Sequence, residues 1–238
     1  MDVEPKTLAA GTPATLAGKP VVANSRRRYL VWGEIVIVFL FLELALWAPT
    51  TQVRNRWAAI LSITILAFVL IDARFDRWRL KRLGLGLPKL FGASVTIGIA
   101  LGMAACMLLM ASWVGERIPA NPTWFPNLQS AWGYGLWALI QEFILQSFFF
   151  NRFEELYGGS PAVWMASTLF ATAHLPSPVL TMATLIGAVF FCEMFRRYRS
   201  LYPLGIVHAM LGITVGLTVP DSLLHHMRVG IGYLRYKS

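Results

Sequence analysis

Seven apolar segments, separated by short polar stretches, dominate the sequence and constrain its fold more than any other feature. Several of them lack the polar face that a surface helix of a soluble protein would need. A helix requires about 20 apolar residues to cross a bilayer, and because some segments are shorter, we expect about seven transmembrane helices, within a range of six to eight. The fold class is therefore expected to be all-α, a polytopic integral membrane protein. The segments span residues 31–47, 57–71, 91–113, 132–150, 161–175, 179–195 and 204–219.

The positive charge of the chain follows the pattern of a membrane topology. Apolar residues make up 56% of the sequence and charged residues 14%, with a net charge of +9. The basic residues form three clusters between apolar segments, and a cytoplasmic N-terminus would place all three on the cytoplasmic side. We therefore expect contact with membrane lipid and none with nucleic acid. The clusters are Arg26, Arg27 and Arg28; Arg74, Arg77, Arg79, Lys81 and Arg82; and Arg196, Arg197 and Arg199.

The chain is expected to have three parts. Residues 1–28 form a disordered cytoplasmic tail, residues 29–220 the transmembrane domain and residues 221–238 a C-terminal tail. Seven spans would leave the basic C-terminal tail outside, so this tail either folds back at the membrane interface or one span is miscounted. Residues 116–132, with three prolines, are expected to form an outside loop. Cys106 and Cys192 lie in apolar segments and indicate neither a disulfide framework nor a metal-binding pair.

Three ionisable side chains lie deep within the later apolar segments. With a rise of about 1.5 Å per residue, Glu142 lies roughly 15 Å along its helix, His174 roughly 20 Å and His208 roughly 10 Å. Since neighbouring helices run in opposite directions, the three can meet at one level of the bilayer and form a site. A structural polar network that joins the helices is the alternative. Glu193 is expected only to pair with Arg196 and Arg197 on its own helix.

Within these segments, three short motifs resemble those of a known family. The stretch QEFILQSFFFNRFEELYGGSPAVWMASTLFATAHL and the later GIVHAMLG resemble the CPBP family, also called Abi, of CAAX proteases and bacteriocin-processing proteins. That family has the motifs EExxxR, FxxxH and HxxxN. Phe170 to His174 matches the second, and His208 is the histidine of the third. The resemblance covers about residues 132–219, and it implies an intramembrane endopeptidase with a central cavity, in which a glutamate and a histidine activate water.

The first and third motifs depart from the family pattern. Gln141 stands at the first glutamate, Gln146 at the arginine and Gly212 at the asparagine. A glutamine cannot take a proton from water, and a general base commonly contributes about 10² to 10⁴ in rate. Three hypotheses stay open: the base has moved to Glu142, catalysis has been lost and a scaffold remains, or the cavity now acts on a prenyl or other lipid substrate.

The candidate catalytic residues are Glu142, His174 and His208, with Gln141, Gln146 and Phe170 in support. We expect either a CPBP-type peptidase or a non-catalytic scaffold that binds peptide or lipid. The expected partners are membrane lipid and a membrane or prenylated peptide. No cofactor can be assigned from the sequence. Two histidines and a carboxylate could hold a metal, but the sequence has no HExxH spacing that would indicate zinc. We expect an integral protein of the bacterial inner (cell) membrane, with the cytoplasmic N-terminus that the basic clusters indicate.

Overall fold

The computed structural model describes residues 25–73, 79–115 and 128–236, and every regular element in these ranges is a helix. Each of the seven apolar segments falls on a helix or on one continuous run of helices. The run of α5, η1 and α6 carries a π-helical middle, η1. The elements are α1 (Ser25–Leu46), α2 (Thr51–Ala73), α3 (Arg79–Arg82), α4 (Leu90–Val114), α5 (Leu128–Glu142), η1 (Phe143–Phe150), α6 (Asn151–Tyr157), α7 (Gly159–Thr172), α8 (Pro178–Tyr198), α9 (Leu201–Thr218), α10 (Asp221–Leu224), η2 (His225–Met227) and α11 (Ile231–Leu234).

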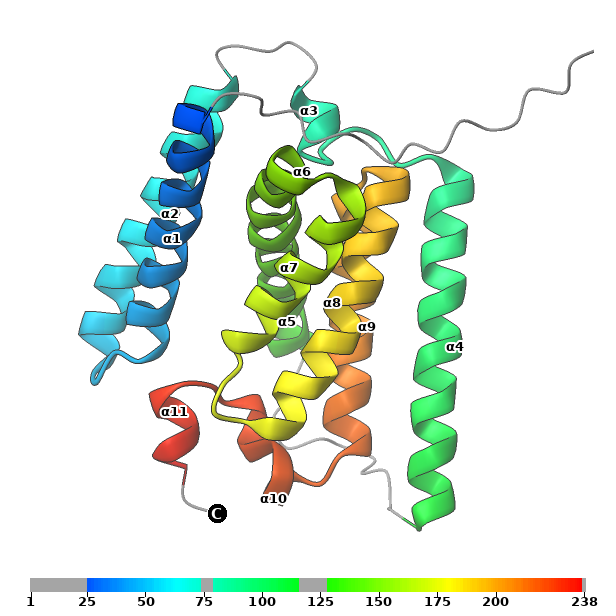
Figure 1. The fold of residues 1–238 in the computed structure, drawn as a ribbon. Coiled ribbons are helices and arrows are strands. Elements are labelled where there is room, and N and C mark those ends of the chain that lie inside the picture. The colour runs from blue at the N-terminus through cyan, green and yellow to red at the C-terminus, as the bar shows by residue number, and fades with distance from the viewer. Residues whose placement is uncertain (1–24, 74–78, 116–127, 237–238) are drawn as a thin grey trace, which may run out of the picture.

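The long helices form a bundle around α7, α8, α5 and α9 (Figure 1). Helix α7 packs against α8, and α5 packs against α9. Helix α4 packs on the outer side of α9, whereas α1 and α2 form a pair at the other edge of the bundle. The apolar side chains between these helices make one core, which includes Phe148, Phe150 and Phe195.

Within the described residues, four helices are long and apolar enough to cross a membrane, namely α1, α4, α8 and α9. Their outward faces are apolar as well. On α4, for example, Leu109 is 71% exposed and Trp113 is 89% exposed. Surfaces of this kind are stable in lipid and costly in water. The expected total of about seven spans stays a prediction, since α2, α5 and α7 do not meet the same criteria of length and composition.

Local sequence explains where several helices begin. Ser177 caps α8 by accepting a hydrogen bond from the Leu180 amide at 3.4 Å, and Pro178 occupies the first position of the helix. Pro203 lies in the first turn of α9, as its position in the sequence predicts. Gly158 separates α6 from α7 with a φ of 83°, a conformation that favours glycine.

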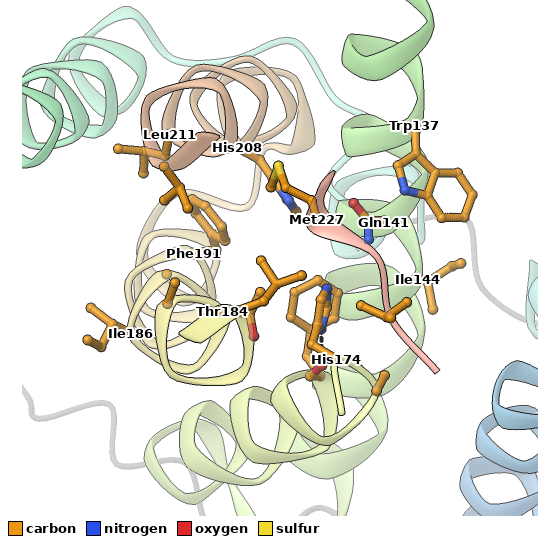
Figure 2. A pocket seen from close by; sticks show the side chains of 18 of the residues that line it. Trp137, Gln141, Ile144, His174, Thr184, Ile186, Phe191, His208, Leu211 and Met227 are labelled. Carbon is orange, nitrogen blue, oxygen red and sulfur yellow. Dashed lines mark hydrogen bonds between the residues drawn. The ribbon is translucent and has the colours of Figure 1, made fainter. Parts of the chain in front are cut away.

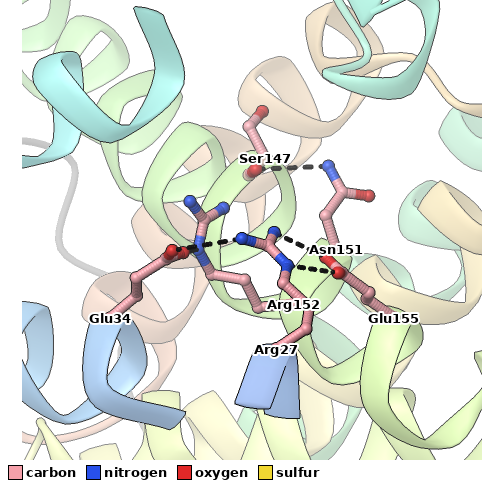
Figure 3. Close-up of polar contacts among 6 residues, drawn as sticks. All are labelled: Arg27, Glu34, Ser147, Asn151, Arg152 and Glu155. Carbon is pink, nitrogen blue, oxygen red and sulfur yellow. Dashed lines mark hydrogen bonds and ion pairs between the residues drawn. The ribbon is translucent and has the colours of Figure 1, made fainter. Parts of the chain in front are cut away.

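Partly buried ion pairs join α1 to the central run of helices (Figure 3). The Arg152 guanidinium donates to Glu34 at 2.8 Å, and Arg27 donates to Glu155 at 3.0 Å. The Arg152 guanidinium also lies 3.8 Å from the centre of the Phe148 ring. Arg152 is buried, so losing Glu34 would leave a buried charge without its carboxylate. These contacts fix the α1 and α2 pair to the bundle.

Described members of all three basic clusters lie at the same end of the molecule as α6. Arg27 reaches Glu155 there, Asn151 donates to the Arg82 carbonyl, and Arg199 binds both Asn151 and Glu154. As predicted, Glu193 pairs along its own helix, with Arg196 at 2.7 Å and Arg197 at 2.5 Å. The common location agrees with the positive-inside pattern, and which side of the membrane this end faces stays a prediction.

The C-terminal tail folds back across the opposite end of the bundle (Figure 1). The Gly230 amide donates to the Leu175 carbonyl at 2.8 Å, and the Arg235 guanidinium binds the Pro49 carbonyl between α1 and α2. The predicted N-terminal boundary at residue 28 needs a correction, because α1 already begins at Ser25 and its first turn is helical. The rest of that predicted tail, residues 1–24, and residues 116–127 of the predicted outside loop lie beyond the described residues.

Candidate active site

A cavity of about 370 Å³ lies within the bundle, toward the end that the C-terminal tail covers. Helices α1, α4, α5, α7, α8 and α9 all contribute to its wall, and Met227 and Val229 of the tail close it. The wall is mostly apolar. Figure 2 shows Gln141, His174 and His208 entering the cavity from three different elements. The polar side chains of the wall are Tyr134, Gln141, His174, Thr184 and His208, with the indole nitrogen of Trp137.

His208 is held from behind by a buried carboxylate. Its Nδ1 lies 2.8 Å from Oε1 of Glu142, which is 0% exposed. The other carboxylate oxygen accepts a hydrogen bond of 3.1 Å from the Gln146 amide. An ionised Glu142 can only accept, so the His208 Nδ1–H donates and Nε2 is the ring nitrogen that remains for a ligand. Glu142 itself does not line the cavity and reaches it through His208.

His174 has a similar orientation but a neutral partner. It follows the end of α7, and its Nδ1 lies 2.8 Å from the Phe170 carbonyl oxygen. A carbonyl only accepts, so this Nδ1 carries the proton and Nε2 presents a lone pair. The two histidines therefore have the same tautomer, each fixed by the acceptor at Nδ1.

Aromatic rings hold both imidazoles in place. The His208 ring stacks on Phe191 with centroids 5.1 Å apart and an interplanar angle of 15°. The Phe170 ring lies 4.8 Å from the His174 ring and 6.2 Å from the His208 ring, so it contacts both. The Phe170 ring thus packs beside the histidines of the second and third motifs, although 33 residues separate the two histidines in the sequence.

The comparison with protein families now identifies this part of the chain. Residues 123–214, which include the helices that carry Gln141, His174 and His208, match the model described as type II CAAX prenyl endopeptidase Rce1-like. The match covers less than half of the chain, and it supports the CPBP or CAAX protease family for this segment. Comparisons with curated proteins and with solved structures found no match. The family match and the apolar helices together support an integral membrane protein.

Two of the three departures from the family motif, Gln141 and Gly212, lie on the cavity wall, whereas Gln146 lies behind it and donates to Glu142. Gln141 lines the cavity, whereas Glu142, the next residue, points behind the wall toward His208. The position where the family has its first glutamate therefore faces the cavity with an amide. Gly212 also lines the cavity, one turn after His208. A base at Glu142 would have to act through His208, because no carboxylate lines the cavity among the described residues.

Metal ligation has little support in this arrangement. The described part of the chain contains no group of three or more His, Cys, Asp or Glu residues placed to hold one ion. Both oxygens of Glu142 already accept hydrogen bonds from His208 and Gln146. Of the two cysteines, Cys106 is exposed on α4 and Cys192 is buried, and both are free thiols.

Sequence reasoning missed the hydroxyls and the indole in the wall. Tyr134 precedes Gln141 by seven residues, two turns of α5, so a helical projection from Gln141 would have placed it on the same face. Thr184 lies on α8, where hydroxyl residues also bond their own helix, and its hydroxyl donates to the Thr181 carbonyl at 3.0 Å. No such spacing singles it out in the sequence.

Proposed function

We propose that this protein is an intramembrane peptidase of the CAAX type that uses a histidine, backed by a buried glutamate, as its general base. The family supports hydrolysis of peptides. The single observation that carries the assignment of the base is the 2.8 Å contact between His208 Nδ1 and the fully buried Glu142. It gives the cavity one imidazole whose protonated form a carboxylate stabilises.

The chemistry follows from the two histidine tautomers. His208 Nε2 accepts a proton from a water molecule as the water oxygen attacks the peptide carbonyl, and the Glu142 carboxylate stabilises the imidazolium that forms. His174 Nε2 accepts a hydrogen bond from the same water and orients it. When the tetrahedral intermediate collapses, the carbon–nitrogen bond breaks and His208 returns its proton to the leaving amine.

The apolar wall selects the substrate in this proposal. A prenyl chain or a row of apolar side chains makes the free energy of peptide binding more favourable, because these groups leave water or the bilayer interface for the cavity. Tail residues Met227 and Val229 contact the same cavity, so part of the substrate lies against the C-terminal tail. Membrane lipid and a membrane or prenylated peptide are thus the proposed partners.

Cleavage of a quenched-fluorescent, farnesylated CAAX peptide by the full chain in liposomes tests the proposal. We expect the native protein to cleave it and His208→Ala to lose about 10² to 10⁴ in kcat, because the general base is gone. His226→Ala is the matched control, since His226 is an exposed histidine of the tail that does not line the cavity. Full activity of His208→Ala would contradict the assignment.

A non-catalytic scaffold that binds peptide or lipid is the second candidate. It is favoured by one observation, that Gln141 presents an amide where the family has a carboxylate and that no other described wall residue supplies one. A scaffold would bind the same farnesylated peptide without cleaving it, and His208→Ala would leave its Kd nearly unchanged. Measuring binding and cleavage on one preparation therefore separates the two functions.

A further inference from the structure

Two glycines of α9 allow α5 to approach it closely. A Cβ at Gly205 would lie 2.7 Å from Cδ1 of Leu139, and a Cβ at Gly212 would lie 1.9 Å from the hydroxyl oxygen of Tyr134. The glycines are seven residues apart, so they lie on the same face of α9, and small residues at such positions let membrane helices pack tightly. The Tyr134 hydroxyl thus occupies the volume that any side chain at position 212 would need.

This hydroxyl lies near the proposed base. Tyr134, His208 and Gly212 all line the same cavity. Gly212 follows His208 by four residues, so it lies on the same side of α9 at a distance of about 6 Å along the axis. The Tyr134 hydroxyl, which lies against Gly212, is therefore about one helical turn along α9 from the backbone of His208. Tyr134 comes from α5, on the same face as Gln141.

The histidines leave one requirement of the proposed reaction unmet. With both Nδ1 atoms protonated toward Phe170 and Glu142, the two Nε2 atoms act as acceptors at the start of the reaction. Peptide hydrolysis also needs a hydrogen-bond donor for the negative charge that develops on the carbonyl oxygen. A phenol hydroxyl is a donor of suitable strength, and it is held here against the helix that carries the base.

We propose that Tyr134 is a catalytic residue whose hydroxyl donates a hydrogen bond to the carbonyl oxygen of the scissile peptide. The inference rests on the proposed peptidase function. As the water oxygen bonds to the carbonyl carbon, the carbonyl π electrons move to oxygen, and the Tyr134 O–H stabilises that oxyanion without transferring its proton. The proton of the water goes to His208 and then to the leaving amine. Gly212 is the residue that leaves room for the hydroxyl.

Tyr134→Phe tests the role with the smallest change, because it removes only the hydroxyl. In the liposome assay with the farnesylated peptide, we expect kcat to fall by about 10² to 10³ while KM changes little, as for loss of an oxyanion donor. Tyr202→Phe is the matched control, since its hydroxyl donates to the Leu85 carbonyl at 3.3 Å, away from the cavity wall. This control should keep native kcat.

A second pair of variants separates chemistry from packing. Gly212→Ala should also lose kcat, because its Cβ displaces the Tyr134 hydroxyl. The double variant Tyr134→Ala with Gly212→Asn places an amide donor in the vacated space, and we expect it to regain at least about tenfold in kcat over Tyr134→Ala alone. If Tyr134 had only a structural role, the asparagine amide at position 212 would not restore kcat to Tyr134→Ala.

The outcomes distinguish this inference from the function on which it rests. If the native protein cleaves and His208→Ala does not, but Tyr134→Phe keeps native kcat, the role of Tyr134 is overturned and the peptidase function stands. If Tyr134→Phe raises KM with kcat unchanged, the hydroxyl binds the ground state only and the inference is likewise overturned. If the native protein binds the peptide without cleaving it, the peptidase function fails and the inference fails with it.

Discussion

At the scale of single residues, Glu142 explains why a carboxylate lies in so apolar a segment. One of its oxygens accepts from His208 and the other from Gln146, so both are satisfied without water. Glu142→Gln keeps the shape but removes the charge that stabilises a protonated His208. We expect kcat for the farnesylated peptide to fall by about 10² to 10⁴, with thermal unfolding close to that of the native protein.

Glu43→Gln is the control for this substitution. Glu43 is another carboxylate of a candidate membrane span, and it does not line the cavity. Its carboxylate accepts a hydrogen bond from the Trp47 indole. Native activity of Glu43→Gln together with loss in Glu142→Gln would support the pair of Glu142 and His208. A native kcat in Glu142→Gln would contradict the proposed role of the Glu142 and His208 pair. If this variant were also more stable to heat, the scaffold function would be favoured, because the substitution removes a buried carboxylate without loss of function.

The sequence could predict that Glu142, His174 and His208 lie near one another, because ionisable groups in apolar segments are costly unless they share a polar site. It could not predict which of two adjacent residues, Gln141 or Glu142, faces the cavity. Neighbouring helical positions differ by about 100°, and the phase of a helix depends on what packs around it. A helical projection from Gln141 could have placed Tyr134 on the same face, but its contact with Gly212 on another helix could not be predicted.

At the scale of elements, the hydropathy pattern predicts the helices well, but not their internal geometry. The eight residues Phe143–Phe150 form a π-helix directly after Glu142. A π-helix is rare and often marks a functional site. Tertiary contacts accompany this one, since the Ser147 hydroxyl donates to the Leu83 carbonyl at 2.7 Å and Asn151 donates to the Arg82 carbonyl at 3.0 Å. Such contacts depend on distant residues and leave no periodic signal in the segment itself.

The C-terminal tail is the element whose stability should depend on pH. The Asp221 carboxylate accepts hydrogen bonds from the Tyr236 hydroxyl and, at 2.7 Å, from the His226 amide. Slight burial alone would raise the pKa of Asp221, but these hydrogen bonds and the neighbouring histidines hold it below its ordinary value. Because the folded pKa is lowered, the stabilisation is complete above the ordinary pKa of about 3.9 and is lost as the pH falls through the folded pKa.

We therefore expect amide hydrogen exchange in residues 225–236 to speed up below about pH 4, after correction for the intrinsic effect of pH on exchange. Asp221→Asn should show the faster exchange already at neutral pH, because it removes the charge of the acceptor. Ser222→Ala, an exposed neighbour, is the control. Unchanged protection in Asp221→Asn would show that the tail is held by its other contacts, such as the one from Gly230 to Leu175.

At the scale of the whole molecule, the two ends of the bundle differ in charge and in function. Arg27, Arg82 and Arg199, one from each basic cluster, contact α6 at one end, and the C-terminal tail lines the cavity toward the other. The sequence predicts this polarity because it depends only on the order of apolar segments and arginines. The number of spans is harder to predict, since α7 has only 14 residues and α5 only 15 before the π-helix.

From the positive-inside rule we predict that the basic end of the bundle, near α6, is cytoplasmic and that the C-terminal tail lies on the other side of the membrane. In a background with Cys106 and Cys192 replaced by serine, a cysteine at Arg197 probes the basic end and one at Ser222 probes the tail. Both positions are exposed, so access to a membrane-impermeant maleimide depends on the side of the membrane alone. In intact cells we expect labelling at position 222 and none at 197, and labelling at both once the membrane is permeabilised.

The reverse pattern would place the tail and the nearby cavity on the cytoplasmic side and would overturn the predicted orientation. It would also change which peptides reach His208. The cavity wall includes Met227 and Val229, so the cavity lies toward the end that the tail covers. With the predicted orientation, this end of the cavity faces the outer leaflet, and we expect the peptides available to His174 and His208 to be those in or beyond it. The labelling pattern thus decides both the topology and the population of substrates to assay.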